Sequence, residues 1–329
     1  MIQVASRKSN GSVGKCCIHD LLRDLSISEA RQNNFFTIHN DRGTSSSSTS
    51  VRLLALHCNV GGYENRNRST VTLRSILSFL GHEVDWEKLH STCGKQLRVV
   101  DALDRPSDRD DFPKEVTEFV LLRYLELGLR CGTLPNAICN LKQLRHLCTY
   151  GFDIDEHPQL NNLRMLQTLC LTAGHWINDG LGELTNLRKL GIDGDISSYH
   201  EALSSSIHKL WNLRSLKLFR GCSIPPFMPF THHLHLYKML LEGHIEKPLE
   251  IPPNLVKLTL MGYESKQDVI SELKKPINVV VIPPRCIRRY CHLGRRMKQE
   301  MKRQMGAQTA LHMSFWTVVS IVAGGFRAL

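Results

Sequence analysis

One short leucine pattern, L-x-x-L-x-L, returns along most of this 329-residue chain. Its copies begin 19 to 26 residues apart, and apolar residues dominate the first, fourth and sixth positions. A period of about 20–50 residues predicts repeat units that stack on one another. The copies begin at Val51, Leu73, Leu97, Leu122, Leu144, Leu166, Leu187, Leu213, Leu236 and Leu255.

Most copies also carry apolar residues upstream of this pattern. Leu134, Ile138 and Leu141 are three or four residues apart, as are Leu160 and Leu163, which places each group on one face of a short helix or 3₁₀ turn. The leucine pattern itself alternates, as a half-buried strand does. A short strand followed by a short helical return is the unit of a leucine-rich repeat. The sequence therefore predicts an α/β leucine-rich-repeat solenoid with a parallel strand ladder over 51–276.

The residues between the leucines are the candidates for binding. Positions on either side of the fourth residue face away from the core, and we expect them on the concave side of the solenoid. Arginine recurs after the first leucine of several copies. It is either an ordinary solvated feature or a basic stripe that attracts an acidic partner or an acidic neighbouring domain. The predicted partner-binding residues are Arg123, Tyr124, Glu126, Arg145, His146, Gln167, Thr168, Arg188, Lys189, Arg214, Ser215 and Lys217.

Residues 1–40 differ from the repeats. Residues 2–5 and 15–18 are typical of two hairpin strands, with a Ser-Asn-Gly turn signal between them. Residues 19–30 predict an amphipathic helix with Asp20 in its first turn. A run of serine and threonine then indicates a flexible linker. The predicted division is residues 1–40, a serine-rich linker over 41–50, the array over 51–276 and a tail over 277–329.

The segment Cys17–Leu25 (CIHDLLRDL) resembles plant intracellular disease-resistance proteins of the coiled-coil, nucleotide-binding (NB-ARC), leucine-rich-repeat class. It matches their Met-His-Asp motif and the following helix, with Ile18 in place of methionine. The stretch 134–147 is similar to the repeats of the same family. The resemblance covers roughly residues 1–275. It implies that residues 1–40 are a winged-helix remnant of the nucleotide-binding region in a truncated receptor.

This resemblance also implies a function, with protein partners. The repeats would form the protein-binding module of a plant innate immune receptor. They would recognise a pathogen effector or a guarded host protein, or would restrain the receptor's nucleotide-binding domain. The alternatives left open are a generic leucine-rich-repeat scaffold, a membrane-tethered adaptor and a non-functional truncated receptor.

The resemblance implies one cofactor residue. In the family the motif's histidine contacts the phosphate of bound ADP, which assigns that role to His19 if a partner supplies the missing lobes. A phosphate loop does not accompany it, because Ser9 replaces the first glycine and Cys16 replaces the Mg²⁺-binding hydroxyl. We therefore predict no cofactor for the chain itself and a capping or surface role for His19.

Catalytic and metal signatures are missing from the sequence. It contains no G-x-S-x-G, no H-E-x-x-H and no dinucleotide fingerprint, so we predict a binding protein and no enzyme. The 11 cysteines form no C-x-x-C pair, which predicts no zinc site. The N-terminus has no apolar secretory segment, which together with unpaired cysteines favours a cytoplasmic location.

The tail carries most of the formal charge of +11. Residues 285–303 hold eight lysines and arginines against Glu300, and residues 313–326 are 14 mainly apolar residues. A membrane span needs about 20 residues. Extension to 307–326 reaches that length but includes polar side chains. The tail is thus either a membrane anchor or a non-native end from truncation or a changed reading frame. Interleaved aromatics are missing, so nucleic-acid binding is not predicted.

Overall fold

The computed structural model describes residues 2–7, 13–33, 35–39, 52–56, 73–78, 86–93, 96–102, 112–128, 133–150, 159–219, 223–224, 230–245, 251–262 and 277–282. Most of its strands belong to one long sheet. Their bounds are β3 Phe36–His39, β4 Leu53–Leu56, β5 Ser75–Ser78, β6 Val99–Ala102, β7 Tyr124–Gly128, β8 His146–Tyr150, β9 Thr168–Thr172, β10 Lys189–Asp193, β11 Ser215–Phe219, β13 Lys238–Glu242, β15 Lys257–Met261 and β16 Asn278–Ile282.

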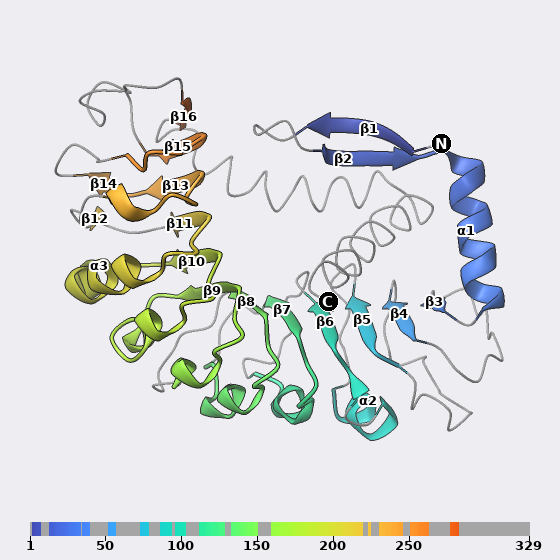
Figure 1. Cartoon of the computed structure of the whole chain (residues 1–329). Helices are drawn as coiled ribbons and strands as arrows, with labels where there is room; N and C mark the ends of the chain where they lie inside the picture. Colours follow the sequence, from blue (N-terminus) through green and yellow to red (C-terminus); the bar gives the residue numbers. More distant parts are fainter. Residues whose placement is uncertain are drawn as a thin grey trace.

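These twelve strands are ordered in the sheet as they follow one another in the chain, from β3 to β16, and neighbouring strands are parallel. Figure 1 shows them along an arc, with the short helical segments on its outer side. The predicted solenoid is confirmed. Two very short strands, β12 (Ser223–Ile224) and β14 (His244–Ile245), pair separately.

The fourth-position leucines form one continuous ladder. Each lies directly opposite its counterpart in the next strand, and each is at most 1% exposed. Because the side chains of a strand alternate between its two faces, this register directs every second residue into a common core. The central members of the ladder are Leu125, Leu147, Leu169, Leu190 and Leu216.

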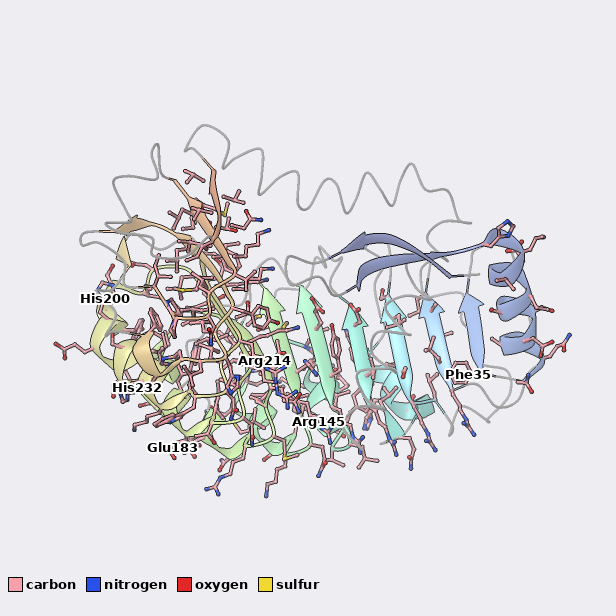
Figure 2. The ribbon with its side chains drawn as sticks, turned by 45° about the horizontal axis from the view of Figure 1, so that its top comes forward. Phe35, Arg145, Glu183, His200, Arg214 and His232 are labelled. Carbon is pink, nitrogen blue, oxygen red and sulfur yellow. The ribbon has the colours of Figure 1, made fainter. Side chains whose placement is uncertain are left out.

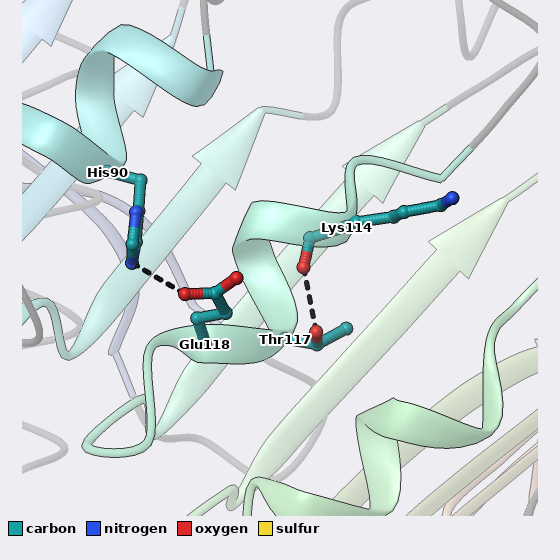
Figure 3. Close-up of polar contacts among 4 residues, drawn as sticks. All are labelled: His90, Lys114, Thr117 and Glu118. Atoms are coloured by element: carbon teal, nitrogen blue, oxygen red, sulfur yellow. Dashed lines mark hydrogen bonds and ion pairs between the residues drawn. The ribbon is translucent and has the colours of Figure 1, made fainter.

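Short helical segments return the chain from one strand to the next. In η5 (Asn136–Asn140), Ile138 is fully buried together with the flanking Leu134 and Leu141, as the apolar spacing predicts. The other segments are α2 Trp86–Cys93, η4 Lys114–Glu118, η6 Leu160–Asn162, η7 His175–Ile177, η8 Leu181–Glu183, η9 Ser197–Tyr199, α3 His200–Lys209 and η10 Phe230–His232. Consecutive segments contact one another on the outer side. There the His90 ring nitrogen lies 3.0 Å from the Glu118 carboxylate, and the Thr117 hydroxyl donates to the Lys114 carbonyl at 2.7 Å (Figure 3).

Asparagines fix the turns that lead into three of the strands. The Asn186 side-chain amide donates to the Arg164 carbonyl of the preceding repeat at 2.9 Å. Asn212 repeats this contact to Thr185 at 3.0 Å, and Asn254 to Leu234 at 2.9 Å. Each of these bonds gives a hydrogen-bond donor to a turn carbonyl that lies outside the strand ladder. The asparagines therefore connect successive turns, and the strand ladder connects successive strands.

The sheet extends beyond the predicted array at both ends. Strand β3 precedes the predicted linker, yet its Phe36 lies in register opposite Leu53. Strand β16, placed in the predicted tail, pairs along its whole length with β15. The N-terminal elements are the antiparallel strands β1 (Ile2–Arg7) and β2 (Val13–Ile18), followed by α1 (Asp20–Gln32). The Ser-Asn-Gly turn and the serine-rich linker lie outside the described residues.

Candidate protein-binding surface

The sheet presents rows of outward side chains on the inner side of the arc, which we call the concave surface. The rows are in register because the strands are, and they alternate with the buried ladder. The first row contains Tyr124, His146, Thr168, Lys189, Ser215, Lys238 and Lys257. The middle row contains Asp101, Glu126, Cys148, Cys170, Gly191, Lys217 and Leu240.

The structure divides the twelve sequence-predicted residues between two places. Seven lie in the two rows, although Thr168 and Ser215 are only 8% and 6% exposed and offer little area to a partner. The other five do not lie in the rows, because each immediately precedes a strand. Side chains alternate between the two faces along a strand, so the residue before a first-row residue points away from that row. They line the edge of the sheet at which the strands begin. These five are Arg123, Arg145, Gln167, Arg188 and Arg214.

A polar network crosses three adjacent strands of the first row. The Tyr124 hydroxyl donates to the Glu126 carboxylate, and the Tyr124 and His146 ring centroids are 5.4 Å apart. His146 Nδ1 lies 3.0 Å from the Thr168 hydroxyl. Burial, followed by the negative charge of Glu126 and Asp101, raises the pKa of Tyr124 above its usual range. These side chains are therefore held by one another, so this part of the surface is ordered before any partner binds.

We predict that His146 stays neutral well into the acidic range. Burial lowers its pKa from 6.5 to about 4, and the positive charges of Lys189, Arg145 and Arg188 add to that shift. Since the folded pKa lies below the unfolded value, the contribution of His146 to stability is complete above pH 6.5. It is lost as the pH falls from 6.5 towards 4.

An NMR titration of the His146 ring should give a midpoint near pH 4. In the variant Lys189→Gln the midpoint should move only part of the way back towards 6.5, because burial, the larger cause, remains. A midpoint of about 6.5 in the unaltered protein would show that the ring is open to solvent.

Charge is distributed unevenly along the middle row. It begins with the acids Asp101 and Glu126 and passes through two thiols and a glycine to Lys217. A Cβ atom at Gly191 would lie 2.9 Å from the Cys170 sulfur, so the sulfur occupies the space of the missing side chain. The first and middle rows are therefore acidic at β6 and β7, small in the middle and basic from β10 onwards, whereas the acids Asp193 and Glu242 lie at the next outward position of β10 and β13.

The paired thiols were not predicted from the sequence. Cys148 and Cys170 lie opposite one another in β8 and β9. A hydrogen bond between them, with burial, raises the pKa of the Cys148 thiol well above its ordinary value. The Cys148 thiol is therefore protonated near neutral pH and poorly nucleophilic. The available signal was that cysteine occupies the fifth position of two consecutive copies of the leucine pattern.

His19 takes the capping place that its sequence predicts. It is exposed at the start of α1, and its Nδ1 accepts the backbone N–H of Leu21 at 3.3 Å. That hydrogen bond holds the ring against its own helix. The sequence before it has other residues at the positions that a phosphate loop requires. The residues present therefore do not fit a nucleotide site.

Among the residues that the structure describes, no helix combines the length and the apolar composition needed to cross a bilayer. Residues 307–326, for which a membrane anchor was one of the two alternatives, lie outside them. The same part of the chain contains no cluster of three or more His, Cys, Asp or Glu residues suited to a metal ion.

Known proteins resemble this chain over most of its length. The family described as "Leucine-rich repeat region" matches residues 72–291. The ToMV resistant protein Tm-2 netted virescent of Solanum lycopersicum is 29% identical, over 83% of this chain and 37% of that protein. The ToMV susceptible protein tm-2 of the same species is also 29% identical, with the same coverage. The disease resistance protein RPP13 of Arabidopsis thaliana is 31% identical over 63% of this chain and 23% of that protein. The chain thus spans about a third of the length of the tomato relatives.

Proposed function

The chain belongs to the leucine-rich repeat region family, and we propose that it acts as the protein-binding repeat module of a plant innate immune receptor. Its resistance-protein relatives support the receptor class. The observation that carries the binding role is the concave surface, where a network of ordered polar side chains lies between an acidic and a basic end. Twelve strands at about 4.8 Å spacing give a surface about 50 Å long, which suits a protein partner.

The concave surface is also where we place recognition specificity. Tomato proteins described as resistant and as susceptible share the same 29% identity with this chain. Overall identity therefore does not separate the two outcomes. The buried ladder is constrained by packing, whereas outward residues such as Lys189 and Lys217 can change without disturbing the core. We infer that such positions decide which partner is bound.

The proposed mechanism is binding without catalysis. The array recognises a pathogen effector or a guarded host protein, or restrains the nucleotide-binding domain of a receptor, in the cytoplasm. A nucleotide-driven switch would belong to the nucleotide-binding region of such a receptor, because the sequence around His19 lacks a phosphate loop. The repeats would act on that switch through contact alone.

Co-expression with the nucleotide-binding regions of the tomato and Arabidopsis relatives, followed by co-immunoprecipitation, tests this function. We expect association, and we expect Lys189→Glu with Lys217→Glu to weaken it, since both residues lie on the concave surface. The matched control is Lys114→Glu with Lys209→Glu, which changes the net charge equally on the helical side. Lys114 lies in η4 (Figure 3), and Lys209 ends α3.

Association that only the concave variant weakens supports the proposal. No association with any of these regions leaves a generic repeat scaffold as the better interpretation. Equal loss in both variants would show that general charge, and not the concave surface, holds the partner.

A further inference from the structure

A column of arginines lines the edge of the sheet at which the strands begin. From β4 to β11 the residue before each strand is arginine in seven of eight cases, with Gln167 as the exception. In Figure 2, Arg145 and Arg214 lie near this edge. We call these seven residues the arginine column: Arg52, Arg74, Arg98, Arg123, Arg145, Arg188 and Arg214.

The backbone holds the column in register. The Arg74 carbonyl accepts the N–H groups of Arg98 and Val99 at 2.8 and 3.1 Å. The Arg123 carbonyl accepts those of Arg145 and His146 at 2.8 and 3.0 Å. The same pair of hydrogen bonds to one carbonyl recurs along the column. The Cα atoms of arginines in neighbouring strands are therefore one strand spacing apart, about 4.8 Å. The first five arginines are consecutive and form an unbroken run.

The guanidinium groups of the column have no acidic partner within the part of the chain that the structure describes. Arg74 and Arg123 are exposed, and only Arg98 and Arg145 are half-buried. The nearby acid Glu126 accepts the Tyr124 hydroxyl, and Glu118 lies against His90. In neighbouring strands the Cα atoms of these arginines are one strand spacing apart, about 4.8 Å, which is shorter than the Debye length of about 8 Å, so their positive charges raise the potential along the edge together and disfavour one another. An anionic ligand would relieve that repulsion.

We propose that the arginine column binds an acidic polypeptide segment that runs along this edge of the sheet. Carboxylates suit the guanidinium fork, which binds them with two parallel hydrogen bonds. A nucleic acid fits less well, because the acids Asp101 and Glu126 lie on the adjoining concave surface and would repel its phosphates. The inference rests on the proposed protein-binding function and adds the chemistry of one partner segment.

The test is the binding of a fluorescent oligoglutamate peptide to the full chain, with an oligothymidylate of equal charge for comparison. The variant Arg74→Gln with Arg123→Gln removes two exposed charges from the column. The control Lys114→Gln with Lys209→Gln removes two from the helical side. The basic segment 285–303 is the same in all three proteins, so the difference between variants reports the column.

We expect the dissociation constant for oligoglutamate to rise about two- to thirtyfold in the column variant and to stay within about twofold in the control. Equal effects of the two variants would overturn the proposal. So would oligothymidylate binding that is as tight and as sensitive to the column. If oligoglutamate does not bind while a nucleotide-binding region still co-precipitates, this inference is wrong and the proposed function is unaffected. If no nucleotide-binding region co-precipitates while oligoglutamate binding still depends on the column, the proposed receptor function is wrong and the binding of an acidic ligand is supported.

Discussion

Replacing Trp176 by alanine is expected to lower the free energy of unfolding by about 3–5 kcal/mol. Trp176 is fully buried in η7, the segment that follows β9, and its indole N–H donates to the Thr172 carbonyl at 2.8 Å. Alanine would leave a cavity where the ring packs and would leave that carbonyl without its donor. Both losses fall in the middle of the array, where neighbouring repeats depend on the same core.

Trp211 provides the matched control. It is 59% exposed in the turn after α3, with the His232 ring centroid 6.5 Å from its own. Trp211→Ala should change the free energy of unfolding by no more than about 0.5 kcal/mol. Urea denaturation followed by circular dichroism compares the two variants, because each removes the same side chain. Similar losses in both would mean that the core does not enclose Trp176.

The sequence was sufficient to predict the buried half of this fold. A strand that alternates and a repeat that returns at a nearly constant interval leave one arrangement in which Leu125, Leu147 and Leu169 share a core, and the register confirms it. The helical returns were also predicted from spacing, because Leu134, Ile138 and Leu141 can meet only on one face of a short helix. These inferences depended on local spacing, which the sequence states directly.

The ends and the outward side chains could not be predicted as well. Strand β3 joins the sheet through backbone pairing, and Phe36–His39 lacks the leucine pattern that marks the other strands. The arginines were assigned to the concave surface from their place in the repeat. Their actual position depends on where each strand begins, which is one residue later. Thr168 is buried partly because His146 lies against it, a contact between residues 22 positions apart.

Two adjacent positions in β10 give the sharpest test of the ladder. Leu190→Asp should lower the free energy of unfolding by more than about 4 kcal/mol, whereas Lys189→Asp should change it by about 0.5 kcal/mol or less. Leu190 is 1% exposed between Leu169 and Leu216, so an aspartate there would bury a charge without a partner. Lys189 is exposed on the concave surface, where water solvates the new carboxylate.

Hydrogen exchange would show which strands lose structure, which a measurement of overall stability does not. In Leu190→Asp the amides of β9 and β11 should lose protection together with those of β10, because each strand donates to its neighbour and no repeat has a core of its own. In Lys189→Asp all three strands should stay protected. Loss confined to β10 would mean that the repeats fold independently. Equal loss in both variants would mean that this strand has no buried face, and the solenoid could not then be one continuous stack.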